Sequence, residues 1–157
     1  MAGPSARLAD VARVLEAAPQ VFTFVEIKPV ALEAHGVGRV VEAVLAELSS
    51  LGDRAAVISF DFEALVASRE LAAQHPIAPI VEDWDQVRGE AGALEPEYLF
   101  CDVRRLPAEG PLELTPELVV YEVVDPNQAL ELGRRGAKFV ETFAFPEMHD
   151  ALELRDE

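Results

Sequence analysis

Two opposite charges, Glu26 and Lys28, lie two residues apart at the end of the otherwise apolar run from Val21 to Lys28. Side chains alternate along a β-strand, so these two residues are predicted to share one face of it. If that face is turned to the protein interior, an unpaired charge there is costly, and the two groups must pair or bind something. An ion pair that closes the strand and a ligand site both remain open.

Lys28 could also act as a Schiff-base nucleophile, a role that requires its neutral amine. The neighbouring carboxylate of Glu26 favours the charged amine and opposes that chemistry. An enzyme of different chemistry, built from Glu26, Lys28 and other acidic residues, is therefore the last of the three hypotheses that we consider.

Six short apolar runs alternate with helix-like stretches, which predicts parallel strands joined by right-handed crossovers in one α/β domain, residues 1–157. Apolar residues at helical spacing predict sheet-covering helices over residues 8–18 and 40–48. Asp125 and Pro126 predict the start of another helix, which ends at Gly136. The predicted strands span residues 21–28, 55–60, 77–81, 97–102, 118–124 and 138–142.

Acidic and polar residues gather at the ends of these predicted strands. In folds of parallel strands the carboxyl ends form the active face, so a ring of acids there indicates a divalent cation. The alternative is that the acids cap the helices that follow, as we predict for Asp61 and Asp125. The residues are Glu26, Lys28, Ser59, Asp61, Glu82, Asp83, Asp102, Glu122, Asp125, Glu141 and Thr142.

Two stretches, 82–95 and 107–116, have a poorer pattern and are predicted as loop with one short helix at most. Trp84 follows the end of a predicted strand. It could line a pocket or cover the rim of the sheet.

The composition excludes several classes of function. A formal charge of −16 repels nucleic acid and disfavours anionic lipid surfaces. No apolar run approaches the roughly twenty residues of a membrane-spanning helix, and Asp10 and Glu16 interrupt any signal peptide, so we expect a cytoplasmic protein. Cys101 is the only cysteine, so there is no intrachain disulfide.

The segment Val25-Glu26-Ile27-Lys28-Pro29 resembles the Glu-Ile-Lys strand of glycerophosphodiester phosphodiesterases. Three further segments occur in the family's order, and the resemblance spans about Leu8 to Pro146. They resemble a Ser-Phe strand end, a Trp-Thr-Val-Asn strand and a closing Gly-Val-Asp-Gly-Ile-Ile-Thr-Asp-x-Pro motif, at residues 57–61, 120–125 and 136–146.

The resemblance implies an incomplete TIM-type (β/α) barrel of about six parallel strands with covering helices. It also implies hydrolysis of glycerophospholipid-derived diesters with a divalent metal, Mg or Ca, and two histidines for acid–base catalysis. Glu26 would ligate the metal, and Lys28 would contact the phosphate. Tyr121, where the family has a tryptophan, and Trp84 are the other candidate substrate contacts.

The family's His-Arg, Glu-x-Asp and His-Asp motifs have no counterpart in this sequence, so we expect a chain truncated at its N-terminus relative to the family. Glu26 alone should hold a hard cation weakly. Proton transfer needs an acid and a base near the same phosphorus. His35, placed in the loop after the first strand, is the best candidate, but the interpretation as a solvated loop residue is favoured over it; His75 is placed at a helix end and His149 in a C-terminal tail.

The leading hypothesis is thus a glycerophosphodiester phosphodiesterase-like domain that is inactive or weakly active on this chain alone, unless a partner completes it. The second is a non-catalytic binding or oligomerisation module that holds a small ligand or cation. Six strands also leave two edges, and the strand at 21–28 has no lysine before its last residue, no bulge and no proline to protect such an edge. We therefore expect a homodimer.

Overall fold

The computed structural model describes residues 6–153, with only the backbone at 88 and 90. Within these residues six strands, all parallel, lie side by side in chain order. The predicted fold class, an incomplete TIM-type (β/α) barrel, is confirmed. The strands are β1 (Thr23–Glu26), β2 (Ala55–Ser59), β3 (Ile77–Val81), β4 (Tyr98–Asp102), β5 (Glu117–Tyr121) and β6 (Phe139–Val140).

Helices connect and flank these strands. The helices predicted over 8–18, 40–48 and after Asp125 are confirmed as α1, α3 and α6. The α-helices are α1 (Leu8–Glu16), α2 (Pro29–His35), α3 (Val37–Leu48), α4 (Phe62–Leu71), α5 (Glu90–Ala93), α6 (Pro126–Arg135) and α7 (Phe145–Glu153). Three short 3₁₀ helices are η1 (Gly52–Arg54), η2 (Trp84–Arg88) and η3 (Val103–Arg105).

Two helices correct the predictions made for histidines. His35 is the last residue of α2 rather than a loop residue, because Pro29 at the first helical position starts a helix directly after Lys28. His149 lies within α7 rather than in an irregular tail. No helix among residues 6–153 is long and apolar enough to cross a bilayer.

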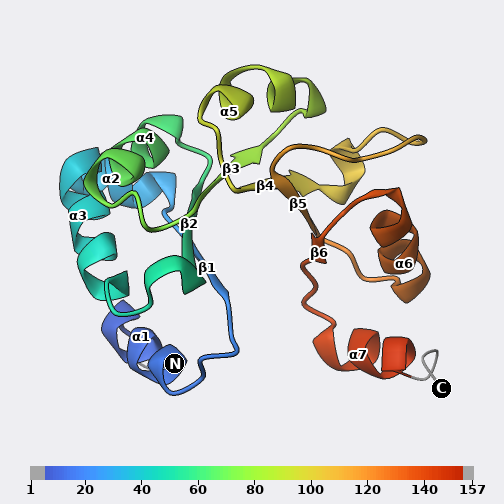
Figure 1. Cartoon of the computed structure of the whole chain (residues 1–157), viewed down its shortest axis with the longest axis horizontal. Coiled ribbons are helices and arrows are strands. Elements are labelled where there is room, and N and C mark those ends of the chain that lie inside the picture. The colour runs from blue at the N-terminus through green and yellow to red at the C-terminus, as the bar shows by residue number, and fades with distance from the viewer. Residues whose placement is uncertain (1–5, 154–157) are drawn as a thin grey trace. The chain divides into compact units, whose positions relative to one another are not determined.

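The chain forms two compact units, Met1–Pro79 and Ile80–Glu157, which we describe separately. In the first unit every residue of β2 is buried, and α2, α3 and α4 lie together on one side of β1 and β2 (Figure 1). Leu48 of α3 and Leu65 of α4 are fully buried. The Ser59 hydroxyl donates to the carbonyl of Ile27 at 2.9 Å, and this bond joins the ends of β2 and β1.

In the second unit β4 and β5 form the buried centre, with Leu99 and Leu118 at most 1% exposed. α6 follows β5 along the chain and begins as predicted, with the Asp125 carboxylate accepting the backbone N–H of Asn127 at 2.8 Å. The helix ends at Gly136, whose φ of 116° lies in the left-handed region that favours glycine.

Candidate functional site

Glu26 and Lys28 form an ion pair at the end of β1. Glu26 is the last residue of the strand, and the Ile27 backbone N–H still donates to the carbonyl of Ile58 at 2.9 Å, so the chain stays extended to Lys28. The Lys28 Nζ lies 2.6 Å from the Glu26 Oε2. Ile27, between them, is only 2% exposed, so the alternation that predicted a shared face for the two charges is confirmed.

The two members of the pair differ in solvation. The Lys28 side chain is 63% exposed because the residue directly precedes α2, whereas the Glu26 side chain is 23% exposed. Our expectation that both charges face a poorly solvated interior is therefore wrong for Lys28. The second carboxylate oxygen of Glu26, Oε1, is buried and has no hydrogen-bond partner among the described residues. An unpartnered buried oxygen marks this carboxylate as the place where a ligand could bind.

The residues present do not complete a metal site. A hard divalent cation takes about six or more oxygen ligands. The Glu26 Oε1 offers one ligand atom, and no group of three or more His, Cys, Asp or Glu side chains within residues 6–153 could hold a metal ion. The fit of a divalent cation to this chain is therefore partial.

In the second unit, Asp102 at the end of β4 is bound to Arg104. The Asp102 Oδ1 accepts the backbone N–H of Arg104 at 2.8 Å and its Nε–H at 2.9 Å, and Oδ2 accepts Nη2–H at 2.5 Å. The Asp102 side chain is 10% exposed and that of Arg104 is 75% exposed. Both oxygens of this carboxylate thus already accept hydrogen bonds from Arg104. We grouped Asp102 with the acids from sequence and missed its partner, although Asp-x-Arg directly after a strand is a readable signal.

The pair has a defined pH dependence. The hydrogen bond from the Arg104 side chain lowers the pKa of Asp102 below its ordinary value, although burial opposes this. Because the folded-state pKa is depressed, the pair contributes stability above the unfolded-state pKa of the carboxyl, and this stability is lost as the pH falls through the depressed value.

Tyr121 and Cys101 lie next to this pair on β5 and β4. Tyr121 is the register partner of Asp102, and burial, followed by the charge of Asp102, raises the pKa of Tyr121 to about 12. Its hydroxyl is therefore protonated at neutral pH and available as a donor. Burial likewise raises the pKa of the fully buried Cys101 thiol to about 12, so it stays an unreactive core residue, as its apolar surroundings predicted.

Trp84 lines a cavity, one of the two alternatives that we kept open. η2 begins with a capping box: the Asp83 carboxylate accepts the backbone N–H of Asp85 at 3.0 Å, and the Gln86 side chain accepts that of Asp83 at 3.2 Å. The cavity of about 220 Å³ is walled by Trp84, Asp85, Val87, Pro111, Glu113 and Leu114. Tyr121 is not one of these residues, so the cavity does not join the two candidate substrate contacts of this unit.

The histidines do not gather around the ion pair of Glu26. His35 lines a shallow hollow of about 310 Å³ with residues of α2 and α3. His75 is 1% exposed, with its Nδ1 3.2 Å from the carbonyl oxygen of Ala55, and is a core residue of the first unit. His149 lies against Phe145 on α7, with ring centres 5.6 Å apart. Within the described residues of the first unit, neither His35 nor His75 forms a hydrogen bond or ion pair with Glu26 or Lys28.

Solved structures with the same fold include phosphodiesterases. A glycerophosphodiester phosphodiesterase from Parabacteroides distasonis matches 96% of this chain with 16% identity and a TM-score of 0.75. A phosphodiesterase from Oleispira antarctica, solved with the product sn-glycerol-3-phosphate, matches 93% with 16% identity and a TM-score of 0.73. The chain spans 65% and 60% of the lengths of those two chains. No protein-family model and no curated protein matches the sequence. At this identity the likeness establishes the fold.

Because Glu26 and Lys28 differ in solvation, replacing one or the other should change the free energy of unfolding by different amounts. Lys28→Met should lower the free energy of unfolding by about 1 kcal/mol, because it leaves the mostly buried carboxylate of Glu26 unpaired. Glu26→Gln should cost less, because the Lys28 ammonium remains in water. The double variant should resemble Glu26→Gln rather than the sum of the two single changes. Chemical denaturation of the three variants measures this, and equal, additive losses would show that the groups are not coupled.

Proposed function

We propose that this chain is a glycerophosphodiester phosphodiesterase-like domain that retains part of a phosphodiester-binding site and, on its own, is inactive or weakly active as a phosphodiesterase. The observation that carries the proposal is the ion pair at the end of β1, where a carboxylate with one buried, unpartnered oxygen adjoins an exposed ammonium group. Glu26 and Lys28 lie in the segment that resembles the Glu-Ile-Lys strand of glycerophosphodiester phosphodiesterases. The fold shared with solved phosphodiesterases supports the same proposal.

Each candidate residue has a role in this proposal. The Glu26 Oε1 is the ligand atom for a divalent cation, and Lys28 is the contact for a phosphate oxygen. Tyr121 and Trp84, the other candidate substrate contacts, belong to the second unit, where the Tyr121 hydroxyl is protonated and Trp84 lines a cavity. A bound cation would supply charge neutralisation for the phosphodiester, which a chain with a formal charge of −16 otherwise repels.

The low activity follows from what the described residues lack. Hydrolysis requires an acid and a base within reach of the phosphorus, and a metal held by several oxygens. The described residues of the first unit offer one unpartnered carboxylate oxygen beside Lys28, and no histidine of that unit pairs with it. Another segment or another chain would have to supply the rest. If none does, the alternative function is a non-catalytic module that holds a small phosphate ester or cation at Glu26 and Lys28.

We expect the chain to release glycerol phosphate from glycerophosphocholine at or near the background rate with magnesium, calcium or manganese. The assay compares the unaltered chain with Glu26→Ala and with Glu42→Ala, an exposed glutamate of α3 that serves as the matched control. Robust turnover that Glu26→Ala abolishes and Glu42→Ala preserves would contradict the proposal, because it would show a complete active site.

We also propose that the domain forms a homodimer, through edge pairing of β1 or exchange of α1. β1 stands at one end of the strand order, and β2 is its one neighbour in the described sheet. Such an edge favours pairing with another chain, while the strong negative charge opposes open-ended association. Sedimentation at micromolar concentration should show a dimer, and a clean monomer would contradict this assembly.

A further inference from the structure

The connection between β4 and β5 differs from the other crossovers of the chain. Each of the other four connections contains an α-helix, whereas this one contains η3 and then residues 106–116 without helix or strand. The segment is nevertheless fixed to α6. The Leu112 N–H donates to the carbonyl of Arg135 at 2.6 Å, and the Arg135 side chain donates to the carbonyls of Gly110 at 2.9 Å and Pro107 at 2.6 Å.

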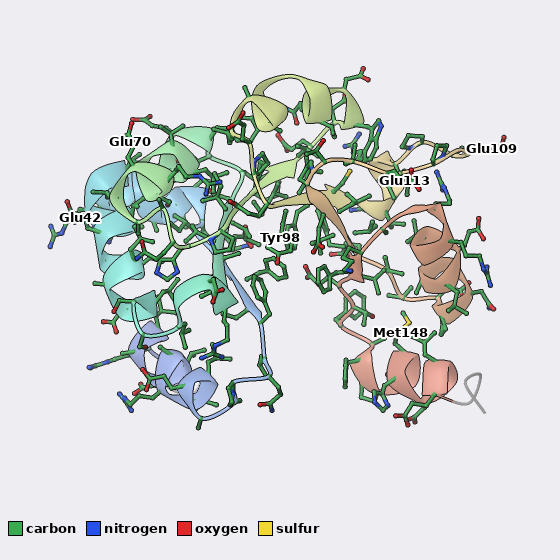
Figure 2. All side chains as sticks on the ribbon, viewed as in Figure 1. Glu42, Glu70, Tyr98, Glu109, Glu113 and Met148 are labelled. Carbon is green, nitrogen blue, oxygen red and sulfur yellow. The ribbon has the colours of Figure 1, made fainter. Side chains whose placement is uncertain are left out.

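Glu113 is held at a defined place in this segment. Its neighbour Leu112 is 1% exposed and anchors the chain in the core. A Cβ atom added to Gly136 would lie 3.0 Å from the Glu113 Cγ and 3.1 Å from its backbone N, so Glu113 sits directly against the end of α6. Figure 2 shows Glu109 at the outer tip of the segment and Glu113 nearer to its base.

Two adjoining cavities lie along this segment, where other crossovers have a helix. The larger, of about 520 Å³, is lined by the apolar residues Val87, Pro96, Leu114 and Pro116, with Gly92, Glu95, Glu113 and Thr115 completing its walls. The smaller, of about 220 Å³, contains Trp84 and Asp85. Both are also lined by Val87, Glu113 and Leu114, so they share a wall. The larger volume falls within the range of about 300–1,000 Å³ that is typical of small-molecule sites.

The charges of the smaller cavity favour a cation. Asp85 and Glu113 are exposed, and their carboxylates make no hydrogen bond or ion pair with any residue that the structure describes; Glu113 also borders a third cavity that Arg134 and Arg135 line. The ring of Trp84 lies in the same lining, and an indole face attracts cations, most strongly where water is excluded. The apolar walls of the neighbouring cavity suit a hydrocarbon chain. The lining of the smaller cavity holds these two carboxylates and no basic residue, so an anion is disfavoured there.

We propose that these two cavities form a binding site for a small organic cation with an aliphatic body, such as an alkylammonium compound. The charged head occupies the cavity between Trp84, Asp85 and Glu113. The aliphatic chain extends along Val87, Leu114 and Pro116. The site belongs to the second unit and uses neither Glu26 nor Lys28. This proposal therefore does not depend on the proposed phosphodiesterase-like function.

Trp84 makes the test direct, because it is the only tryptophan of the chain and lies in the site itself. Hexylammonium at neutral pH should change its fluorescence in a saturable way, and calorimetry should give the same affinity. Neutral hexanol, with the same chain, should bind at least about tenfold more weakly, a difference of about 1.4 kcal/mol. Added salt should weaken the binding of hexylammonium because it screens the carboxylates.

Glu113→Gln should weaken hexylammonium binding about fivefold or more. Glu109→Gln is the matched control, since Glu109 is exposed on the same segment but lines neither of the two cavities; it lines a third one, which Glu113 also borders. Both positions are exposed, so both variants should fold, which circular dichroism checks. Equal binding of hexanol and hexylammonium, or unchanged binding by Glu113→Gln, would overturn the proposal.

Discussion

The structure depends on how the chain passes from the end of each parallel strand into the crossover connection that follows. The first backbone N–H groups of a helix or 3₁₀ turn have no partner within it and need an acceptor. Four aspartates at or just after strand ends provide these acceptors. Asp61 caps α4, Asp83 caps η2, Asp102 caps η3 and Asp125 caps α6.

This requirement decides which acidic residues remain available for chemistry. Capping consumes carboxylate oxygens of the four aspartates, and Asp102 gives its remaining capacity to Arg104. Glu26 differs because α2 begins at Pro29, which has no N–H to satisfy at the first helical position, and no side-chain cap is formed there. Its carboxylate therefore pairs with Lys28 and keeps one oxygen unpartnered. Among the acids of that predicted ring, Glu26 is the one that has a buried carboxylate oxygen without a partner in the described structure.

The strands and most helices were predictable because their signals are local. Apolar runs predicted all six strands, and Asp125, Pro126 and Gly136 predicted both ends of α6. The shared face of Glu26 and Lys28 followed from alternation alone. The exposure of Lys28 could not be predicted in this way, because it depends on the helix that begins at Pro29, which we predicted as a loop. The pairing of Asp102 with Arg104, the open carboxylate of Glu113 and the cavities around it depend on how residues 106–116 pack against α6, which no local pattern reveals.

The central claim is that the described strand ends offer one buried, unpartnered carboxylate oxygen, at Glu26, and no group of side chains that could hold a metal ion. Calorimetric titration with manganese tests it most directly, with Glu26→Gln and the exposed-residue variant Glu42→Gln measured in parallel. The account predicts a dissociation constant on the order of 1 mM or weaker for all three proteins, since one ligand atom cannot replace a hydration shell. Micromolar binding that Glu26→Gln abolishes and Glu42→Gln preserves would contradict it.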